Sequence, residues 1–249
     1  MWIDLKTPIV IAHRGDKRYA PENTLSAFNQ AADKGADAIE FDVKLSADEE
    51  VVVLHDKSVD RTTNGTGKAA NLSLAVLKSL DASVLFPGKF TGENIPTLEE
   101  VFESVGQRLH MNVELTNYST LYDNLVPKVV ELVKKHKMMD KVFFSSFSAR
   151  NLLIAHRMLP EVPRGLLTLP GLLGLWGRTF GWRSDYYALN PYYSDINSRL
   201  VSALHAARKR VIAWTVNIEA DVRRMIGLSV DGIITDDPQF VLKLLGRAK

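Results

Sequence analysis

The chain has 249 residues, of which 46% are hydrophobic and 24% are charged, as is typical of a globular protein. Its 31 basic and 29 acidic residues leave a net charge of only +2, so we expect no nucleic-acid binding, and any affinity for phosphate must be local. The absence of cysteine excludes disulfides, thiolate metal sites and a cysteine nucleophile.

The first six residues lack the layout of a signal peptide and lead directly into a predicted strand. The longest apolar stretch, residues 166–177, is too short and too rich in glycine and proline to cross a bilayer. We therefore expect a cytoplasmic protein.

Eight short apolar runs along the chain predict buried parallel strands. They are residues 9–12, 38–43, 111–115, 142–145, 165–168, 187–190, 211–216 and 232–235. Helical patterns lie between many of them, at residues 24–34, 97–105, 121–136, 149–158, 198–207 and 219–228. Eight strand-then-helix units in about 250 residues predict a TIM (β/α)8 barrel. A doubly wound open sheet is the alternative, although no glycine-rich dinucleotide loop follows the first strand.

Two segments interrupt this alternation. Residues 57–95, after the second strand region, contain turn sequences such as Asn64-Gly65 and one modest helical pattern at 73–80. We expect a small insertion within a single barrel domain that spans residues 1–249. Residues 169–183 follow the fifth strand and combine tryptophan and phenylalanine with arginine. Packing on the barrel and contact with a lipid surface both remain open for this segment.

The second predicted strand carries two acidic residues, Glu40 and Asp42, between apolar neighbours. Side chains of a strand alternate between its two faces, so both carboxylates lie on one face. Acidic groups that point into a packed interior are costly unless a cation or hydrogen bonds compensate them. Since no basic residue accompanies them on the predicted strand, a hard metal cation is the natural partner.

Other polar residues lie at the ends of neighbouring strands. His13 ends the first strand and Glu114 lies near the end of the third, so both should meet Glu40 and Asp42 at the C-terminal mouth of a barrel. Three carboxylates suit Ca²⁺ or Mg²⁺, which prefer oxygen ligands. The planar guanidinium group of Arg14 adds N–H donors whose geometry suits phosphate oxygens.

A second histidine, His55, can be placed if residues 51–55 fold back on the second strand as a hairpin. A turn centred on residues 47–48 sets Asp42 opposite Val53 and Glu40 opposite His55. Phosphodiester cleavage needs one group to take a proton from the nucleophile and another to protonate the leaving alkoxide, and two histidines supply both.

Short motifs follow one another in order along nearly the whole chain. They are His13-Arg14-Gly15, Pro21-Glu22-Asn23-Thr24, Gly35-Ala36-Asp37, Glu40-Phe41-Asp42-Val43, His55-Asp56, residues 61–67, Asn112-Val113-Glu114, Ser146-Phe147, residues 214–217 and residues 231–236. The ordered set resembles the signature of glycerophosphodiester phosphodiesterases. That resemblance implies a TIM barrel with a small insertion after the His-Asp motif, which matches residues 57–95.

The resemblance also implies residue roles. Glu40, Asp42 and Glu114 would bind a divalent cation, often Ca²⁺ or Mg²⁺. His13 and His55 would act as general acid and base.

By the same resemblance, Arg14 would hold the phosphate and Trp214 would help to wall the pocket for the glycerol or alcohol part of the substrate. The implied reaction of lipid and glycerol metabolism is metal-dependent hydrolysis of glycerophosphodiesters to glycerol 3-phosphate and an alcohol.

One departure from the family pattern concerns the substrate. The family commonly places a lysine two residues after the third acidic ligand, where this chain has Thr116. A pocket cation is therefore missing or supplied from elsewhere. Together with the apolar and aromatic residues of segment 169–183, this raises lysophospholipase D-type hydrolysis of lysophospholipids as an alternative, with peripheral contact to a membrane surface through that segment.

Two further alternatives use the same mouth. A non-catalytic barrel could bind phospholipid headgroups or a protein partner, but a site without catalysis has no need of two histidines beside three acids. An aldolase or isomerase of a sugar phosphate would grip phosphate with the loops after strands seven and eight. Asp231, Asp236 and Asp237 make that region acidic, which disfavours this alternative.

Overall fold

A computed structural model describes residues 2–90, 92–120, 122–180 and 186–248. The strands of these residues are β1 (Ile9–His13), β2 (Ala38–Leu45), β3 (Val51–Val53), β4 (His110–Leu115), β5 (Val142–Ser146), β6 (Arg164–Thr168), β7 (Ala188–Pro191), β8 (Arg210–Ala213) and β9 (Gly232–Thr235). The α-helices are α1 (Leu25–Asp33), α2 (Leu74–Ser79), α3 (Leu98–Val105), α4 (Leu125–Lys135), α5 (Ala149–Met158), α6 (Leu175–Phe180), α7 (Ser198–Ala206), α8 (Glu219–Gly227) and α9 (Pro238–Leu244).

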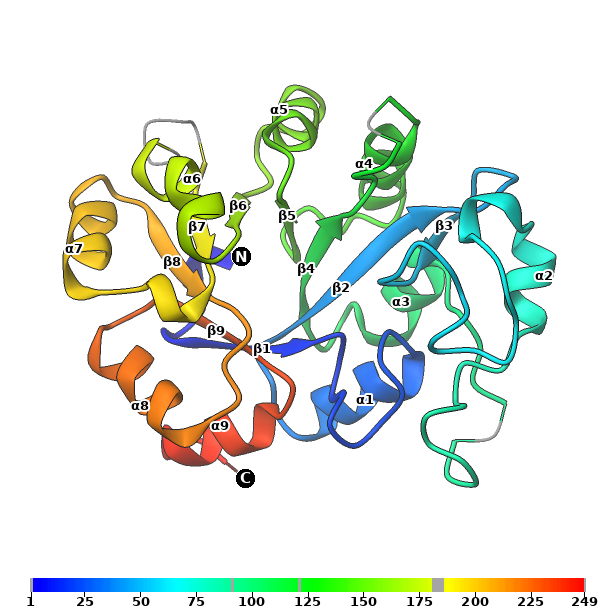
Figure 1. Ribbon diagram of the computed structural model, residues 1–249, viewed down its shortest axis with the longest axis horizontal. Coiled ribbons are helices and arrows are strands. Elements are labelled where there is room, and N and C mark those ends of the chain that lie inside the picture. Colours follow the sequence, from blue (N-terminus) through cyan, green and yellow to red (C-terminus); the bar gives the residue numbers. More distant parts are fainter. Residues whose placement is uncertain (1, 91, 121, 181–185, 249) are drawn as a thin grey trace.

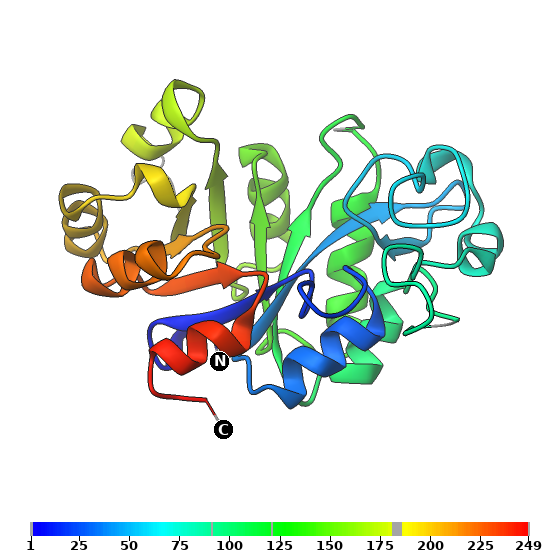
Figure 2. The ribbon, with the colours of Figure 1, turned by 60° about the horizontal axis from the view of Figure 1, so that its bottom comes forward.

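Eight parallel strands close into a barrel, because β1 pairs with β2 on one side and with β9 on the other. The order around the barrel is β1-β2-β4-β5-β6-β7-β8-β9, and helices lie around the outside (Figure 1). The predicted TIM (β/α)8 barrel is confirmed. The loops after β4 and β6 rise on one side, whereas both chain ends lie on the other (Figure 2).

Alternation along the strands separates two apolar layers. Ile39, Phe41 and Val43 of β2 belong to the large buried cluster between the strands and the helices. A smaller cluster fills the barrel interior, where Trp2 packs against Phe143 with ring centroids 5.1 Å apart. Since residues of β2 at positions between the apolar ones face this interior, the acidic pair points into the barrel.

Two predicted elements differ from the structure by three or more residues at one end. The strand expected at 211–216 ends at Ala213, because Trp214 makes only an isolated bridge with Tyr192. The helix expected at 121–136 begins at Leu125. The carboxylate of Asp123 accepts hydrogen bonds from the Leu125 backbone N–H (3.0 Å) and from Asn117 Nδ2 (2.7 Å), which holds the preceding residues in a loop.

The predicted hairpin exists, but its predicted register is wrong. Strand β3 pairs antiparallel with β2, with Val43 opposite Val53 and Leu45 opposite Val51. Asp42 therefore lies opposite Leu54, whose backbone N–H donates to the Asp42 carbonyl at 2.9 Å. The turn is one residue longer than the expected turn centred on 47–48, because Glu49 adopts a left-handed conformation (φ 60°) within it.

The described residues of segment 57–95 form loops, a 3-10 helix at Ala69–Asn71 and α2, beside the β2–β3 hairpin (Figure 1). Their apolar side chains gather in a small cluster in which Val59, Leu77 and Ile95 pack with Val52 and Leu54. The cluster thus includes Val52 of the hairpin, so this segment packs against the hairpin.

Segment 169–183 is described as far as residue 180. It contains a 3-10 turn at Gly171–Gly174 followed by α6. Residues 181–183, with Trp182 and Arg183, lie outside the described residues, as do the side chains of Trp176 and Phe180. Within the described part of the chain, every helix is too short or too polar to cross a membrane.

Candidate active site

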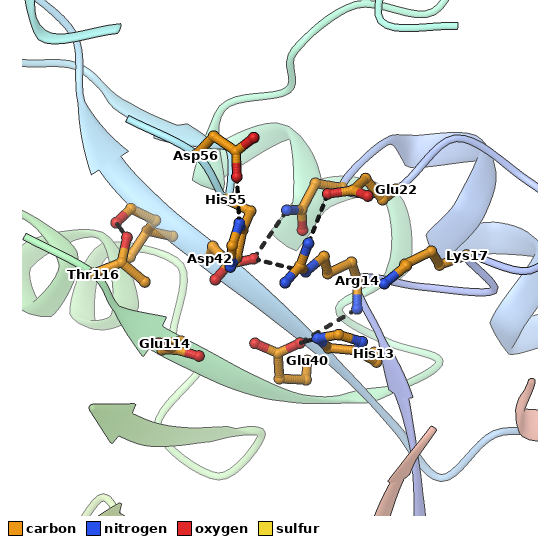
Figure 3. A network of polar contacts seen from close by, with 12 residues as sticks. His13, Arg14, Lys17, Glu22, Glu40, Asp42, His55, Asp56, Glu114 and Thr116 are labelled. Carbon is orange, nitrogen blue, oxygen red and sulfur yellow. Dashed lines mark hydrogen bonds and ion pairs between the residues drawn. The ribbon is translucent and has the colours of Figure 1, made fainter. Parts of the chain in front are cut away.

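Three carboxylates meet at the barrel mouth (Figure 3). Glu40 and Asp42 come from β2 and Glu114 from β4, and the strand register pairs Asp42 directly with Glu114. One oxygen of each carboxylate lies within 4.8 Å of the others. The structure therefore brings together the three acids that the sequence nominates as metal ligands.

The electrostatics of this cluster favour a cation. Burial and the neighbouring carboxylates raise the pKa of Glu40 well above its usual range and raise that of Glu114 to about 8. Arg14 lies nearby, with its Nε 3.4 Å from Asp42 Oδ2, but its charge does not outweigh these effects. A cluster of oxygen donors with unbalanced negative charge fits a hard divalent cation such as Ca²⁺ or Mg²⁺.

His13 lies beside this cluster and is oriented by an acid from the opposite end of the chain. Its Nδ1 donates to Asp236 Oδ1 at 2.6 Å, and its Nε2 is 4.0 Å from Glu40 Oε2. A carboxylate only accepts, so the proton sits on Nδ1 and Nε2 is left with a lone pair. Burial lowers the pKa of His13 more than Asp236 raises it, which favours this neutral form.

His55 has the same arrangement with a different carboxylate. Its Nδ1 donates to Asp56 Oδ1 at 2.6 Å, and the imidazole lines the same cavity as His13 and Glu114. The side chain of His55 is 42% exposed, so it lies at the solvent side of the mouth. The structure thus brings His55 to the carboxylates, although not through the predicted strand register.

A chain of ion pairs connects the loop that follows His13 with the loop that contains His55. Arg61 of the insertion donates to Asp56 Oδ2 (2.6 Å) and to both oxygens of Glu22 (2.8 and 2.9 Å). Glu22 in turn accepts from Arg14 Nη1 at 2.8 Å. Burial opposes the ionisation of Glu22, but the two arginines outweigh it and lower its pKa to about 2. Arg14 is therefore held by acids on two sides.

The loop after β1 has an unusual backbone that places these groups. Arg14 and Asn23 both adopt left-handed conformations, with φ of 58° and 59°. The Asn23 backbone N–H donates to the Arg14 carbonyl at 3.0 Å, and its Nδ2 donates to Asp42 Oδ2 at 3.0 Å. Asparagine tolerates this conformation better than most residues, which explains its presence here.

These groups surround a cavity of about 170 Å³. Trp214 forms part of its wall, packed edge to face on Phe147 with ring centroids 5.5 Å apart. The cavity also contains polar side-chain atoms of Asn112 and Ser145 that are buried and lack a hydrogen-bond partner among the described residues. The cavity is thus suited to an apolar contact on one side and to hydroxyl groups at its base.

The position that departs from the family pattern has a basic neighbour. Lys44 Nζ donates to Thr116 Oγ1 at 2.7 Å. Lys44 lies two residues after Asp42, and Thr116 lies two residues after Glu114. Lys44 and Thr116 therefore form the next pair on the same face of the two strands, on the C-terminal side of the acids, and we call this pair the next rung. The sequence leaves open whether the pocket cation is missing or supplied from elsewhere, and the structure places a lysine of β2 beside Thr116.

Several supporting residues were not assigned a role from sequence. Asp236 directly follows the last predicted strand, and its place at a strand end was a usable signal. Lys44 has the period of Glu40 and Asp42, which also could have identified it. Nothing local marks Tyr118, whose hydroxyl donates to Glu114 Oε1 at 2.7 Å.

Comparisons with known proteins identify the family of the chain. Residues 13–240 match the family model described as the glycerophosphoryl diester phosphodiesterase family. The chain is 41% identical over 240 residues to a glycerophosphodiester phosphodiesterase of Caldanaerobacter subterraneus subsp. tengcongensis, covering 96% of this chain and 98% of that protein. It is 36% identical to the Bacillus altitudinis enzyme of the same description, over 96% and 99% of the two chains. A solved phosphodiesterase of Oleispira antarctica in complex with the product sn-glycerol-3-phosphate has a TM-score of 0.87 and 34% identity, covering 96% of this chain and 97% of that one.

Proposed function

The chain belongs to the glycerophosphoryl diester phosphodiesterase family and is a glycerophosphodiester phosphodiesterase, and we propose how its barrel mouth performs the hydrolysis. Glu40, Asp42 and Glu114 hold one divalent cation, Ca²⁺ or Mg²⁺. Such a cation, when bound, neutralises the phosphodiester and polarises its phosphorus.

Proton transfer is assigned to His13 and His55. Each imidazole donates through Nδ1 to a carboxylate, so each presents Nε2 to the cavity. One imidazole takes a proton from the attacking oxygen as the new P–O bond forms, and the other protonates the alkoxide as the ester bond breaks. The observation that carries the proposal is that both imidazoles line the cavity of the acidic cluster, each with its Nδ1 on a carboxylate.

Substrate binding is assigned to Arg14, Trp214 and the base of the cavity. Arg14 points its guanidinium at the acidic cluster and holds a phosphate oxygen there. The indole of Trp214 packs on the carbon chain of glycerol. The unpartnered polar atoms of Asn112 and Ser145 are suited to bind the glycerol hydroxyls.

Two variants test the catalytic assignment. His13→Ala and His55→Ala should each lower kcat/KM for glycerophosphocholine by about 10²-fold or more, with unchanged circular dichroism. His205→Ala is the matched control, because that imidazole lies on α7 and pairs with Asp231 outside the cavity. Unchanged turnover in either variant would remove that histidine from the mechanism. No turnover by the unaltered chain with Ca²⁺, Mg²⁺ or Mn²⁺ would support a non-catalytic barrel.

One observation supports lysophospholipid hydrolysis as a second candidate. Leu172 and Leu173 in the turn before α6 are 85% and 82% exposed, on the segment after β6. Leu172→Ser with Leu173→Ser should lower activity on lysophospholipid micelles at least about fivefold more than activity on glycerophosphocholine, if these leucines enter a lipid surface. Leu153→Ser on α5, an exposed leucine elsewhere, is the control. Equal effects on both substrates would reject the lipid candidate.

A further inference from the structure

We propose that a second cavity beside the catalytic pocket binds a leaving alcohol that carries an additional phosphate group. The chain would then prefer glycerophosphodiesters with an anionic leaving group over those with a neutral or cationic one. This inference rests on the proposed hydrolytic function and specifies its substrate.

The catalytic pocket is smaller than the cavity beside it. Its volume is about 170 Å³, whereas the neighbouring cavity measures about 460 Å³. The second cavity lies between the end of β2, the insertion at residues 68–71 and the loop after β4. A bulky alcohol can therefore extend from the acidic cluster into it.

Residues that line the two cavities follow one another along β2 and the end of β4. Asp42 pairs with Glu114 in the register of β2 and β4, and Lys44 and Thr116 form the next rung. In Figure 3, Thr116 lies on the side of Glu114 away from His13. Lys44 and Thr116 line the second cavity, so this cavity begins two residues along the chain from Asp42 and Glu114.

Three lysines give this cavity its charge. Lys44, Lys57 and Lys68 all line it. Lys57 and Lys68 are exposed, and no carboxylate of the described residues lies within ion-pair distance of either. Their backbones are held together, since Ser58 bridges Lys68 and the Ala69 N–H donates to the Lys57 carbonyl at 3.0 Å. Two ammonium groups are thus available to an anion.

The two acidic residues of the cavity have hydrogen-bond or ion-pair partners other than its lysines. Asp123 accepts from Asn117 Nδ2 (2.7 Å) and from Thr120 Oγ1 (2.6 Å). Glu49 pairs with Lys128 at 3.6 Å and accepts from Asn124 Nδ2 at 3.1 Å. Neither carboxylate forms an ion pair with Lys57 or Lys68, and the three lysines that line the cavity outnumber its two acids, so the cavity favours a negatively charged ligand.

The test compares two substrates that differ by one phosphate, glycerophosphoinositol 4-phosphate and glycerophosphoinositol. The unaltered chain should have a higher kcat/KM for the phosphorylated substrate, by about tenfold. Lys57→Gln with Lys68→Gln should bring that ratio close to one. Lys137→Gln with Lys243→Gln removes two charges from exposed lysines outside both cavities and should leave the ratio unchanged.

The outcomes separate this inference from the proposed function. If the unaltered chain hydrolyses both substrates at the same kcat/KM, or if both double variants change the ratio equally, the anionic subsite is refuted and hydrolysis stands. If the chain hydrolyses neither substrate with Ca²⁺, Mg²⁺ or Mn²⁺, the proposed function fails first and the subsite with it.

Discussion

Asp236 is a positioning residue whose effect should pass through His13. Its carboxylate fixes the proton of His13 on Nδ1, from 223 positions away in the chain. Burial of Asp236 opposes its ionisation, but the hydrogen bond and charge of His13 outweigh burial and lower the pKa of Asp236 to about 2. The pair is therefore an anion beside an imidazole throughout the physiological range.

Asp236→Asn should lower kcat/KM by about 10²-fold or more, because an amide can also stabilise the wrong tautomer of His13. Since Asp236 raises the pKa of His13, its loss should move the acid limb of the pH profile of kcat/KM to lower pH. A fall in activity with an unmoved acid limb would mean that Asp236 acts on the fold alone.

Because Lys44 and Thr116 are neighbours from β2 and the end of β4, the lysine can be moved from one position to the other by mutation. Lys44→Thr should lower kcat/KM about tenfold, because it removes the cation on the rung above the acids. Adding Thr116→Lys restores an ammonium group from the neighbouring strand, so the double variant should recover most of the loss. If Thr116→Lys rescues nothing, the charge at this rung contributes no binding, and Lys44 matters only through its packing.

Among the elements, the loop after β1 and the insertion depend on each other. Glu22 bridges Arg14 and Arg61, and through them it connects the acid cluster to the loop that carries His55. Its folded pKa of about 2 lies below its ordinary value of 4.5. The ion pair is therefore fully stabilising above about pH 4.5 and is lost as the pH falls towards about 2.

Glu22→Gln should flatten the loss of stability between about pH 4.5 and pH 2 and lower the free energy of unfolding at pH 7 by about 2 kcal/mol. Urea unfolding at a series of pH values measures both. Glu219→Gln is the control, because that carboxylate forms an exposed pair with Arg223 on α8. Parallel pH curves for Glu22→Gln and the unaltered chain would contradict the linkage.

For the whole molecule, cation binding and folding should be coupled. The buried acids repel one another, as the raised pKa values of Glu40 and Glu114 indicate. A cation at 100 times its dissociation constant would add about 2.7 kcal/mol, or roughly 5–10 °C in Tm for a chain of this size. Chelation should remove this gain, and Ca²⁺ or Mg²⁺ should restore it.

The Glu114→Gln variant distinguishes the repulsion between the buried carboxylates from the binding of the cation. It should raise the Tm of the chelated protein above about pH 8, where Glu114 is ionised and the substitution removes a buried charge, and abolish most of the gain on adding Ca²⁺ or Mg²⁺. Glu131→Gln on α4, an exposed acid far from the cluster, should change neither. A full cation-induced rise in Glu114→Gln would exclude Glu114 as a ligand.

The barrel and most of the site could be predicted from the periodicity of apolar residues and from the order of the strands along the chain. Period-two alternation places Glu40 and Asp42 on one face, and parallel strands bring their carboxyl ends to one mouth. His13 and Glu114 at strand ends must therefore meet the acidic pair. These relations depend only on spacing along the chain and on the geometry of a closed parallel barrel.

The tertiary structure decided the contacts made through loops. Glu49 at φ 60° shifts the hairpin register, and the left-handed Arg14 and Asn23 set where the guanidinium points. The bridge from Glu22 to Arg61 likewise joins residues 39 positions apart. Local hydrophobic pattern does not encode such contacts, because loop backbones are chosen by side chains distant in sequence and close only after the barrel has folded.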